Sequence, residues 1–173
     1  NMILQLGKAK ADGKISKLFV MGCLAERFLA QLREELPEVD KFYGKFNWKE
    51  MLHDLGKSYK DDLSSERYIT TPPHYAYLKI SEGCNRYCAF CAIPLITGRH
   101  KSIPMEELLR EVELLVKQGV KEFNVIAQDL SSYGVDLYGK MMLPELIHQM
   151  AQIPGVEWIR LHYAYPTQFP YEI

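Results

Sequence analysis

Three of the four cysteines in this chain of 173 residues lie in one short segment, Ser81–Pro94. Cys84, Cys88 and Cys91 have the spacing C-x3-C-x2-C, so one loop can turn three thiolates toward a common site. Thiolates are the usual ligands of iron–sulfur clusters and of structural zinc, and ligands close together in sequence do not require the closure of long loops. The segment therefore predicts a metal centre that the rest of the fold must hold in place.

The number of ligands separates the kinds of metal centre. A cubane cluster has four irons, so three cysteines leave one iron open to another ligand. Structural zinc normally takes four protein ligands, and His100 is near enough in sequence to complete a three-cysteine, one-histidine site. A disulfide with a spare thiol is a weaker reading, because we expect no secretion signal and four cysteines do not make a dense disulfide framework.

Composition indicates an ordinary globular protein, with 47% hydrophobic and 25% charged residues. The net charge of −1 gives no general attraction to nucleic acid, although a separate module could supply a basic surface. The uncharged runs are shorter than the roughly 20 apolar residues that span a bilayer, so we expect no membrane partner. These features predict a reducing, cytoplasmic setting.

Residues 1–56 show short helices and strands in alternation. The patterns predict helices near residues 1–12, 23–36 and 47–55, the last with Asn47 as N-cap, and strands near 17–22 and 39–43. Leu24, Phe28, Leu29 and Leu32 share one face of the second helix. Such alternation is typical of an α/β unit with a parallel sheet. Cys23 follows the first strand, where such sheets place ligands, so it is either a metal ligand or a small buried hydrophobe.

Residues 57–74 are rich in Lys, Asp, Ser and Thr and predict a linker at a domain boundary. After it, strands are expected near 75–80, 122–127 and 158–163, with helices near 104–118 and 143–153 between them. This βαβαβ series builds a doubly wound sheet or a (β/α) barrel. Three such units cannot close a barrel, so we expect the chain to be incomplete, to pair with its other half, or to present an open sheet whose last helices are missing.

Function should gather at the carboxyl ends of these strands, where three loops would rim one site. They are the cysteine loop, a polar loop from Gln128 to Lys140 and a loop at residues 164–166. Gln128 ends the second strand, so it is either a cofactor contact or a loop-capping amide. His162 is either structural or lines the pocket, whereas His53 and His148 are expected on helix surfaces.

Phe90 directly precedes the third cysteine, and the resulting pattern C-x3-C-x-aromatic-C resembles the signature loop of radical S-adenosylmethionine (SAM) enzymes. The resemblance implies that Cys84, Cys88 and Cys91 bind a [4Fe-4S] cluster whose open iron is chelated by SAM. It also implies that Phe90 lies close to the adenine of that cofactor.

A longer match resembles the methylthiotransferase family of these enzymes, through the segments Met21–Arg27, Glu82–Pro94 and Gly98–Pro104. The family has an amino-terminal α/β domain that binds a second [4Fe-4S] cluster, a radical SAM domain built as a (β/α) partial TIM barrel, and a carboxyl-terminal TRAM domain. The resemblance implies that residues 1–56 are the end of the first domain, 57–74 a linker and 75–173 the start of the second.

In that family Cys23 would be the third ligand of the second cluster. The other two amino-terminal cysteines of the family are absent from this chain. Thr97 and Ile103 also stand where the family often has arginine, which puts an anion contact there in doubt. We therefore expect the second cluster only in the intact protein and expect the fragment alone to be inactive.

Two segments, Ala127–Tyr138 and Arg160–Pro166, resemble the RimO branch of the family. This branch adds a methylthio group to the β-carbon of an aspartate in ribosomal protein S twelve. The MiaB branch, which modifies a tRNA adenosine, more usually has Gly-Gln-Asn where this chain has Ala-Gln-Asp. MiaB-like activity and a non-enzymatic zinc module remain the alternatives.

The resemblance implies a radical mechanism with two clusters in the intact protein. An electron donor of flavodoxin or ferredoxin type would reduce the first cluster, which splits SAM to give a 5′-deoxyadenosyl radical that takes hydrogen from the aspartate. Polar acid–base chemistry is a poor route to this unactivated carbon, so no general acid or base is expected among the side chains.

Overall fold

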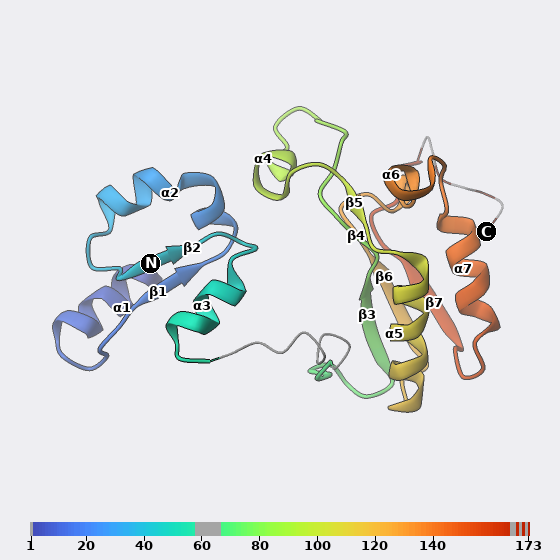
Figure 1. The fold of residues 1–173 in the computed structure, drawn as a ribbon, viewed down its shortest axis with the longest axis horizontal. Coiled ribbons are helices and arrows are strands. Elements are labelled where there is room, and N and C mark those ends of the chain that lie inside the picture. Colours follow the sequence, from blue (N-terminus) through green and yellow to red (C-terminus); the bar gives the residue numbers. More distant parts are fainter. Residues whose placement is uncertain (1, 58–66, 167–168, 170, 172) are drawn as a thin grey trace. The chain divides into compact units, whose positions relative to one another are not determined.

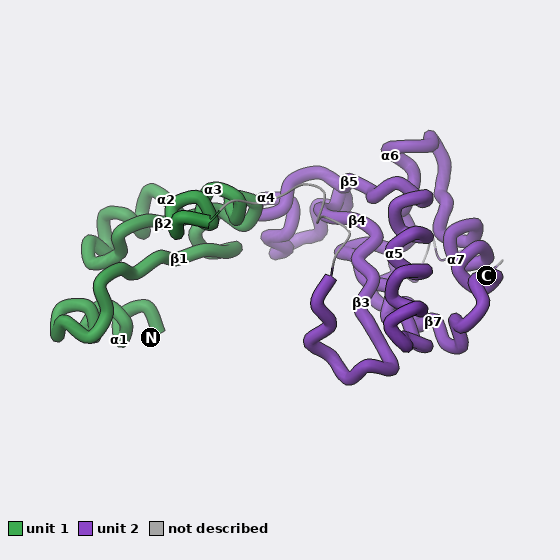
Figure 2. The backbone as a smooth tube through the Cα atoms, turned by 60° about the horizontal axis from the view of Figure 1, so that its bottom comes forward, with its two compact units in different colours: residues 1–62 green, residues 63–173 purple. Residues whose placement is uncertain are grey.

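A computed structural model of the chain describes residues 2–57, 67–166, 169, 171 and 173. Contacts divide the chain into two compact units, residues 1–62 and 63–173, which are coloured separately in Figure 2. The predicted linker lies partly outside the described residues, and the predicted domain limits stay a prediction. Within the described part of the chain, the helices are too short or too polar to cross a membrane.

Unit 1 contains a parallel pair of short strands with helices around them. Its elements are α1 (Met2–Ala11), β1 (Phe19–Met21), α2 (Cys23–Glu35), β2 (Lys41–Tyr43) and α3 (Trp48–Asp54). β1 and β2 pair in parallel, with Val20 opposite Phe42. The apolar core comprises Leu18, Ala25, Leu32, Val39 and Phe42. The predicted α/β alternation with a parallel sheet is confirmed.

Two local details of unit 1 differ from expectation. α2 has a kink at Phe28, where φ is −121° and ψ is 29°, and this interrupts the helical period. Of the predicted face, Leu32 is buried and Leu29 packs against the core. Leu24 and Phe28 are 51% and 36% exposed. Asn47 does precede α3, but its side chain makes no cap hydrogen bond. Its amide Nδ2 donates to the Glu50 carboxylate at 3.2 Å.

Unit 2 is built on a parallel sheet of three strands with helices on one face. The sheet order is β3 (Tyr75–Lys79), β6 (Glu122–Ile126), β7 (Trp158–Leu161), and α5 (Met105–Lys117) and α7 (Leu143–Gln152) make the crossovers (Figure 1). Each strand is added beside the previous one, so both right-handed crossovers lie on the same side. This arrangement is typical of a (β/α) barrel, whereas a doubly wound sheet reverses its strand order and has helices on both faces.

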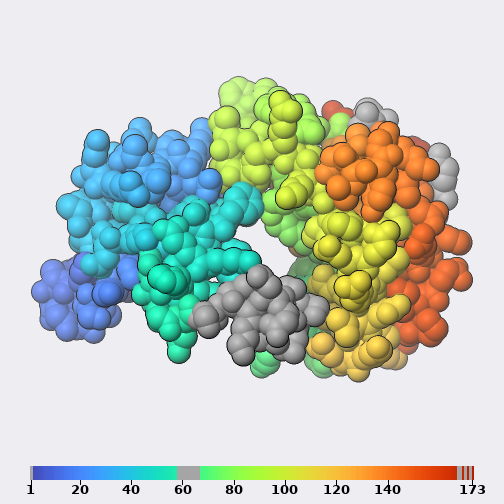
Figure 3. All heavy atoms as spheres, in the orientation of Figure 1, coloured from blue at the N-terminus to red at the C-terminus, as the bar shows by residue number. Residues whose placement is uncertain are grey.

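The core of unit 2 lies between the sheet and these helices, which cover much of the sheet in the view of Figure 3. Alternate strand residues point into this core, because side chains of a strand alternate between its two faces. The buried set includes Ala76, Leu78, Phe123 and Val125 from the strands, and Leu108, Val112, Leu115, Leu146 and Met150 from the helices. Burying a large aliphatic side chain contributes about 1.5–3 kcal/mol, so this interface accounts for much of the fold's stability.

The opposite face of the sheet is polar. The strand register places Tyr77, Asn124 and Arg160 side by side there. His162 bonds to this face through Nε2 and the Oδ1 of Asn124, 3.1 Å apart. The structural reading of His162 is therefore the better one, and His53 and His148 are exposed as predicted.

Several short elements of unit 2 were not predicted. β4 (Ser81–Glu82) and β5 (Lys101–Ser102) form a small antiparallel ladder around the cysteine loop, which also contains α4 (Ile93–Thr97). The segment expected to be a polar loop contains a 3-10 helix, η2 (Leu130–Ser132), and a short helix, α6 (Val135–Tyr138). β4, β5 and η2 contain mostly polar residues, and α4 and α6 span only about one turn, so no hydrophobic period reveals them in the sequence.

Asp54 provides a pH-dependent contact in unit 1. Its Oδ2 accepts hydrogen bonds from Lys41 Nζ and from the buried Tyr43 hydroxyl, both at 2.6 Å. The Lys41 bond, followed by the Tyr43 bond, lowers the pKa of Asp54 to about 2. Because the folded-state pKa lies below the unfolded one, ionised Asp54 stabilises unit 1 above about pH 4 and loses this effect as the pH falls toward 2.

We therefore expect Asp54→Asn to lower the unfolding midpoint of unit 1 at pH 7, with the difference from wild type fading toward pH 2. Trp48 in α3 reports on this unit when Trp158→Phe removes the only other tryptophan. Asp12→Asn is the control, because Asp12 makes only an exposed ion pair with Lys14 at 3.4 Å. An equal effect of D54N at both pH values would contradict the assignment.

Candidate metal and cofactor site

The three cysteines of the loop line one cavity, of about 220 Å³, at the carboxyl end of the sheet. Cys84 is 8% exposed, whereas Cys88 and Cys91 are exposed to solvent. The loop begins where β3 ends and returns through α4 to β5, so the β4–β5 ladder closes its base. The expected convergence of the three thiols on one site is thus present in the structure.

Close backbone packing fixes the start of this loop. Gly83 has a φ of +78°, and a Cβ at this position would lie 2.2 Å from the carbonyl oxygen of Arg99. Only glycine tolerates both the positive φ and the close approach of the Arg99 carbonyl. The neighbouring Cys84 amide donates to the Gly98 carbonyl at 3.3 Å, which ties the outgoing and returning strands of the loop together.

Two turns within the loop direct the other cysteines. Tyr87 and Phe90, each directly before a cysteine, have φ values of 47° and 64° in the left-handed region. Such conformations cost about 1–3 kcal/mol in a non-glycine residue and are found mainly at functional sites. Phe90 is fully exposed and does not line the cavity, so its predicted contact with adenine stays a prediction.

The other walls of the cavity come from the ends of β6 and β7, as the three-loop prediction requires. They are formed by Gln128, Asp129, Tyr163, Ala164 and Tyr165 together with Arg86 and Ile93. A second cavity of about 330 Å³ shares Ile93, Gln128 and Tyr163 with the first and extends to Lys79 at the end of β3. The site therefore offers room beside the thiols for an organic cofactor or substrate.

Gln128 presents a hydrogen-bond acceptor to these cavities. Its Nε2 donates to Glu82 Oε1 at 2.6 Å, and an ionised carboxylate can only accept, so the orientation of the amide is fixed. The Oε1 of Gln128 is buried and has no hydrogen-bond partner among the described residues. Buried polar atoms are normally paired, so this oxygen suits a ligand that brings an N–H or O–H donor.

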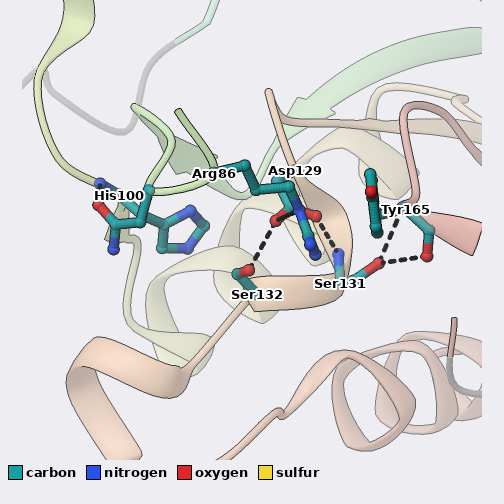
Figure 4. Close-up of polar contacts among 7 residues, drawn as sticks. Arg86, His100, Asp129, Ser131, Ser132 and Tyr165 are labelled. Atoms are coloured by element: carbon teal, nitrogen blue, oxygen red, sulfur yellow. Dashed lines mark hydrogen bonds and ion pairs between the residues drawn. The ribbon is translucent and has the colours of Figure 1, made fainter. Parts of the chain in front are cut away.

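An ion pair that was not predicted joins the cysteine loop to the end of β6. Arg86 Nε lies 2.6 Å from Asp129 Oδ2, and the guanidinium carbon lies 3.8 Å from the ring centroid of Tyr165 (Figure 4). Arg86 and Asp129 are far apart in sequence, so their contact was not predicted. The sequence features that could have indicated it are an arginine between two of the cysteines and an aspartate directly after a strand.

His100 does not join the cysteines. Its ring is buried, and its Nε2 lies 3.2 Å from the Ser102 hydroxyl, which itself donates to Asp136. Burial opposes ionisation of Asp136, but the hydrogen bonds from Ser102 outweigh it and lower the pKa of this carboxyl. Among the described residues, no three His, Cys, Asp or Glu side chains are arranged around a single metal ion. Within the described residues His100 therefore does not complete a three-cysteine, one-histidine site.

Cys23 lies in unit 1, as the first residue of α2 and directly beyond β1. It is exposed, so the reading of a small buried hydrophobe is wrong. Its role as a cluster ligand stays a prediction.

The donor set of the loop fits an iron–sulfur cluster. Each iron of a cubane takes its own thiolate, so the three sulfurs need not meet at one ion as they would around zinc. Cys84, Cys88 and Cys91 face one cavity and leave its far side to Gln128 and the tyrosines. A cluster held there would keep an open position toward the part of the site that has room for a cofactor.

Comparison with known proteins agrees with this chemistry. Residues 78–164, about half of the chain, match the Radical SAM superfamily. The chain is 66% identical over its full length to a protein of Bacteroides thetaiotaomicron, 65% to one of Phocaeicola vulgatus and 52% to one of Flavobacterium johnsoniae. All three are named ribosomal protein uS12 methylthiotransferase RimO.

The chain spans 40% of the length of these relatives. The relatives confirm the resemblance to the RimO branch, which rested on short motifs. Together, the family match and the cysteine loop on a parallel sheet show that the chain belongs to the radical SAM superfamily.

Proposed function

We propose that the protein is a RimO-like radical SAM methylthiotransferase, which adds a methylthio group to the β-carbon of an aspartate in ribosomal protein S twelve. The observation that carries the proposal is the cavity that Cys84, Cys88 and Cys91 share with the end of β6. The names of relatives that are 52–66% identical over this whole chain support the choice of substrate. A modifier of a ribosomal protein would act in the cytoplasm.

The cysteine loop would hold the [4Fe-4S] cluster of the superfamily, with SAM at its open iron. When bound, these two groups supply the one-electron chemistry that lets an unactivated C–H bond react. Gln128 Oε1 would accept a hydrogen bond from an N–H or O–H group of SAM, and Phe90 would contact its adenine. The protein's part is to position these groups and to exclude water, so no side chain needs to act as a general acid or base.

Cys23 would be a ligand of a second [4Fe-4S] cluster. The other three cysteines of this chain belong to the first site, so further ligands of a second cluster would have to come from outside these 173 residues. Reduction of the first cluster needs a one-electron donor, and a flavodoxin or ferredoxin would serve. We expect no membrane partner.

Cluster content tests the ligands. After anaerobic reconstitution with iron and sulfide, this chain should hold about four irons, and Cys84→Ala should lose them because one of three thiolate ligands is removed. Cys23→Ala is the matched control and should keep the full iron content. One zinc and no iron in the wild-type chain would contradict the proposed function.

SAM affinity tests Gln128. We expect Gln128→Leu to raise the Kd for SAM about twofold to tenfold in the reconstituted protein, because a hydrogen bond contributes roughly 0.5–1.5 kcal/mol. Iron content should be unchanged. Gln118→Leu, at the exposed end of α5, should bind SAM as the wild type does. Equal affinity of Q128L and wild type would remove Gln128 from the SAM site.

The substrate is tested with the full-length protein. Incubation with SAM, a reductant and either ribosomal protein S twelve or tRNA should give a methylthio group only on the ribosomal protein, detected by mass spectrometry. The Cys84→Ala variant is the control and should give no product. Product on tRNA alone would favour the MiaB-like alternative, and we expect the 173-residue chain by itself to be inactive.

A further inference from the structure

The carboxylate of Asp129 is a buried charge that connects three loops of the site. Asp129 is 2% exposed, and its Oδ2 accepts from Arg86 Nε and from the Ser132 hydroxyl, both at 2.6 Å. Its Oδ1 accepts from the Ser131 amide at 3.2 Å (Figure 4). A buried carboxylate is tolerated only when it is paired and hydrogen-bonded, so this arrangement depends on its partners.

The third loop joins through Tyr165. The Tyr165 amide donates to the Ser131 hydroxyl at 3.0 Å, and that hydroxyl lies 3.4 Å from the Tyr165 carbonyl oxygen. The Tyr165 ring in turn stacks on the guanidinium of Arg86. The contacts therefore form a closed ring that runs from the cysteine loop to the end of β6, to the end of β7 and back to the cysteine loop.

Arginine is well suited to this place. A planar guanidinium can donate to a carboxylate while its face stacks on an aromatic ring, which the ammonium of lysine cannot do equally well. Arg86 lies midway between Cys84 and Cys88, so whatever holds its side chain also limits the movement of both thiols. Arg86 and Asp129 line the same cavity as the cysteines.

We propose that Arg86 is a positioning residue for the iron–sulfur site. Its contacts with Asp129 and Tyr165 lock the cysteine loop against the ends of β6 and β7 before the cluster binds. Its charge, at the wall of the cavity, also favours the reduced and more negative state of the cluster, so it raises the reduction potential. The part of this inference that concerns the potential rests on the proposed function.

Hydrogen exchange tests the locking of the loop in the full-length protein without its clusters. The Cys84 and Cys91 amides are protected by hydrogen bonds to the carbonyls of Gly98 and Cys88, at 3.3 and 3.0 Å. We expect Arg86→Gln and Arg86→Lys to speed exchange of both amides about tenfold, because each loses the stacked ion pair. The control is Arg110→Gln, on the exposed side of α5, which should leave these amides unchanged.

Reduction potential separates the charge of Arg86 from its packing. The potential is measured in the reconstituted protein with Cys23→Ala, which removes the second cluster. Arg86→Gln should lower the reduction potential of the first cluster by about 59 mV, which corresponds to a tenfold change in the equilibrium constant of a one-electron couple. Arg86→Lys should stay near the wild-type potential, because it keeps the charge. If Arg86 acted only by holding the loop in place, Arg86→Gln and Arg86→Lys would change the reduction potential equally.

Unchanged exchange in both Arg86 variants would overturn the locking role, and equal potentials for Arg86→Gln and Arg110→Gln would overturn the electrostatic role. If the wild-type protein takes up no iron, the proposed function and the electrostatic role fail together, and the exchange measurement still decides whether Arg86 locks the loop.

Discussion

The parallel pairing of β6 with both β3 and β7 is the constraint on which the site depends. Parallel strands in sequence order bring their carboxyl ends to one edge of the sheet, so the loops that follow them meet there. The cysteine loop and the ends of β6 and β7 thereby face one cavity, although they are separated by tens of residues in sequence. α5 and α7 pack on one face of the sheet and fix it in place. The carboxyl edge of the sheet is left to irregular segments.

Irregular segments near a cavity need partners for their polar groups, and here side chains provide many of them. Asp129 accepts from two neighbouring serines and an arginine, and Ser102 bonds to Asp136 while it accepts from the Gly134 amide. These bonds hold the loops more firmly than their short elements would by themselves. Three buried side-chain atoms stay without a partner in the described part of the chain, namely Ser81 Oγ, His100 Nδ1 and Gln128 Oε1. Of these residues Gln128 alone lines the cavity, so its oxygen marks where a ligand would complete the network.

The sequence predicts the features that repeat or cluster locally. The apolar stripe of α5 and the short strands have the right periods, and three cysteines within eight residues are unmistakable. It does not predict the pairing of Arg86 with Asp129, because that contact depends on the register and direction of side chains 43 residues apart. The kink at Phe28 and the turn of the Asn47 amide toward Glu50 are likewise not predicted, because helix propensity sets neither the backbone angles of one residue nor the direction of one side chain.

The two groups of cysteines differ in how much of a site this chain contains. The residues that line the cysteine cavity all lie between Cys84 and Tyr165, within unit 2. Cys23 stands at the end of a two-stranded sheet without another cysteine in unit 1, so the chain provides only one thiolate there. The cysteines of unit 2 supply the three thiolates of the proposed first cluster, whereas Cys23 would supply one thiolate to the proposed second cluster.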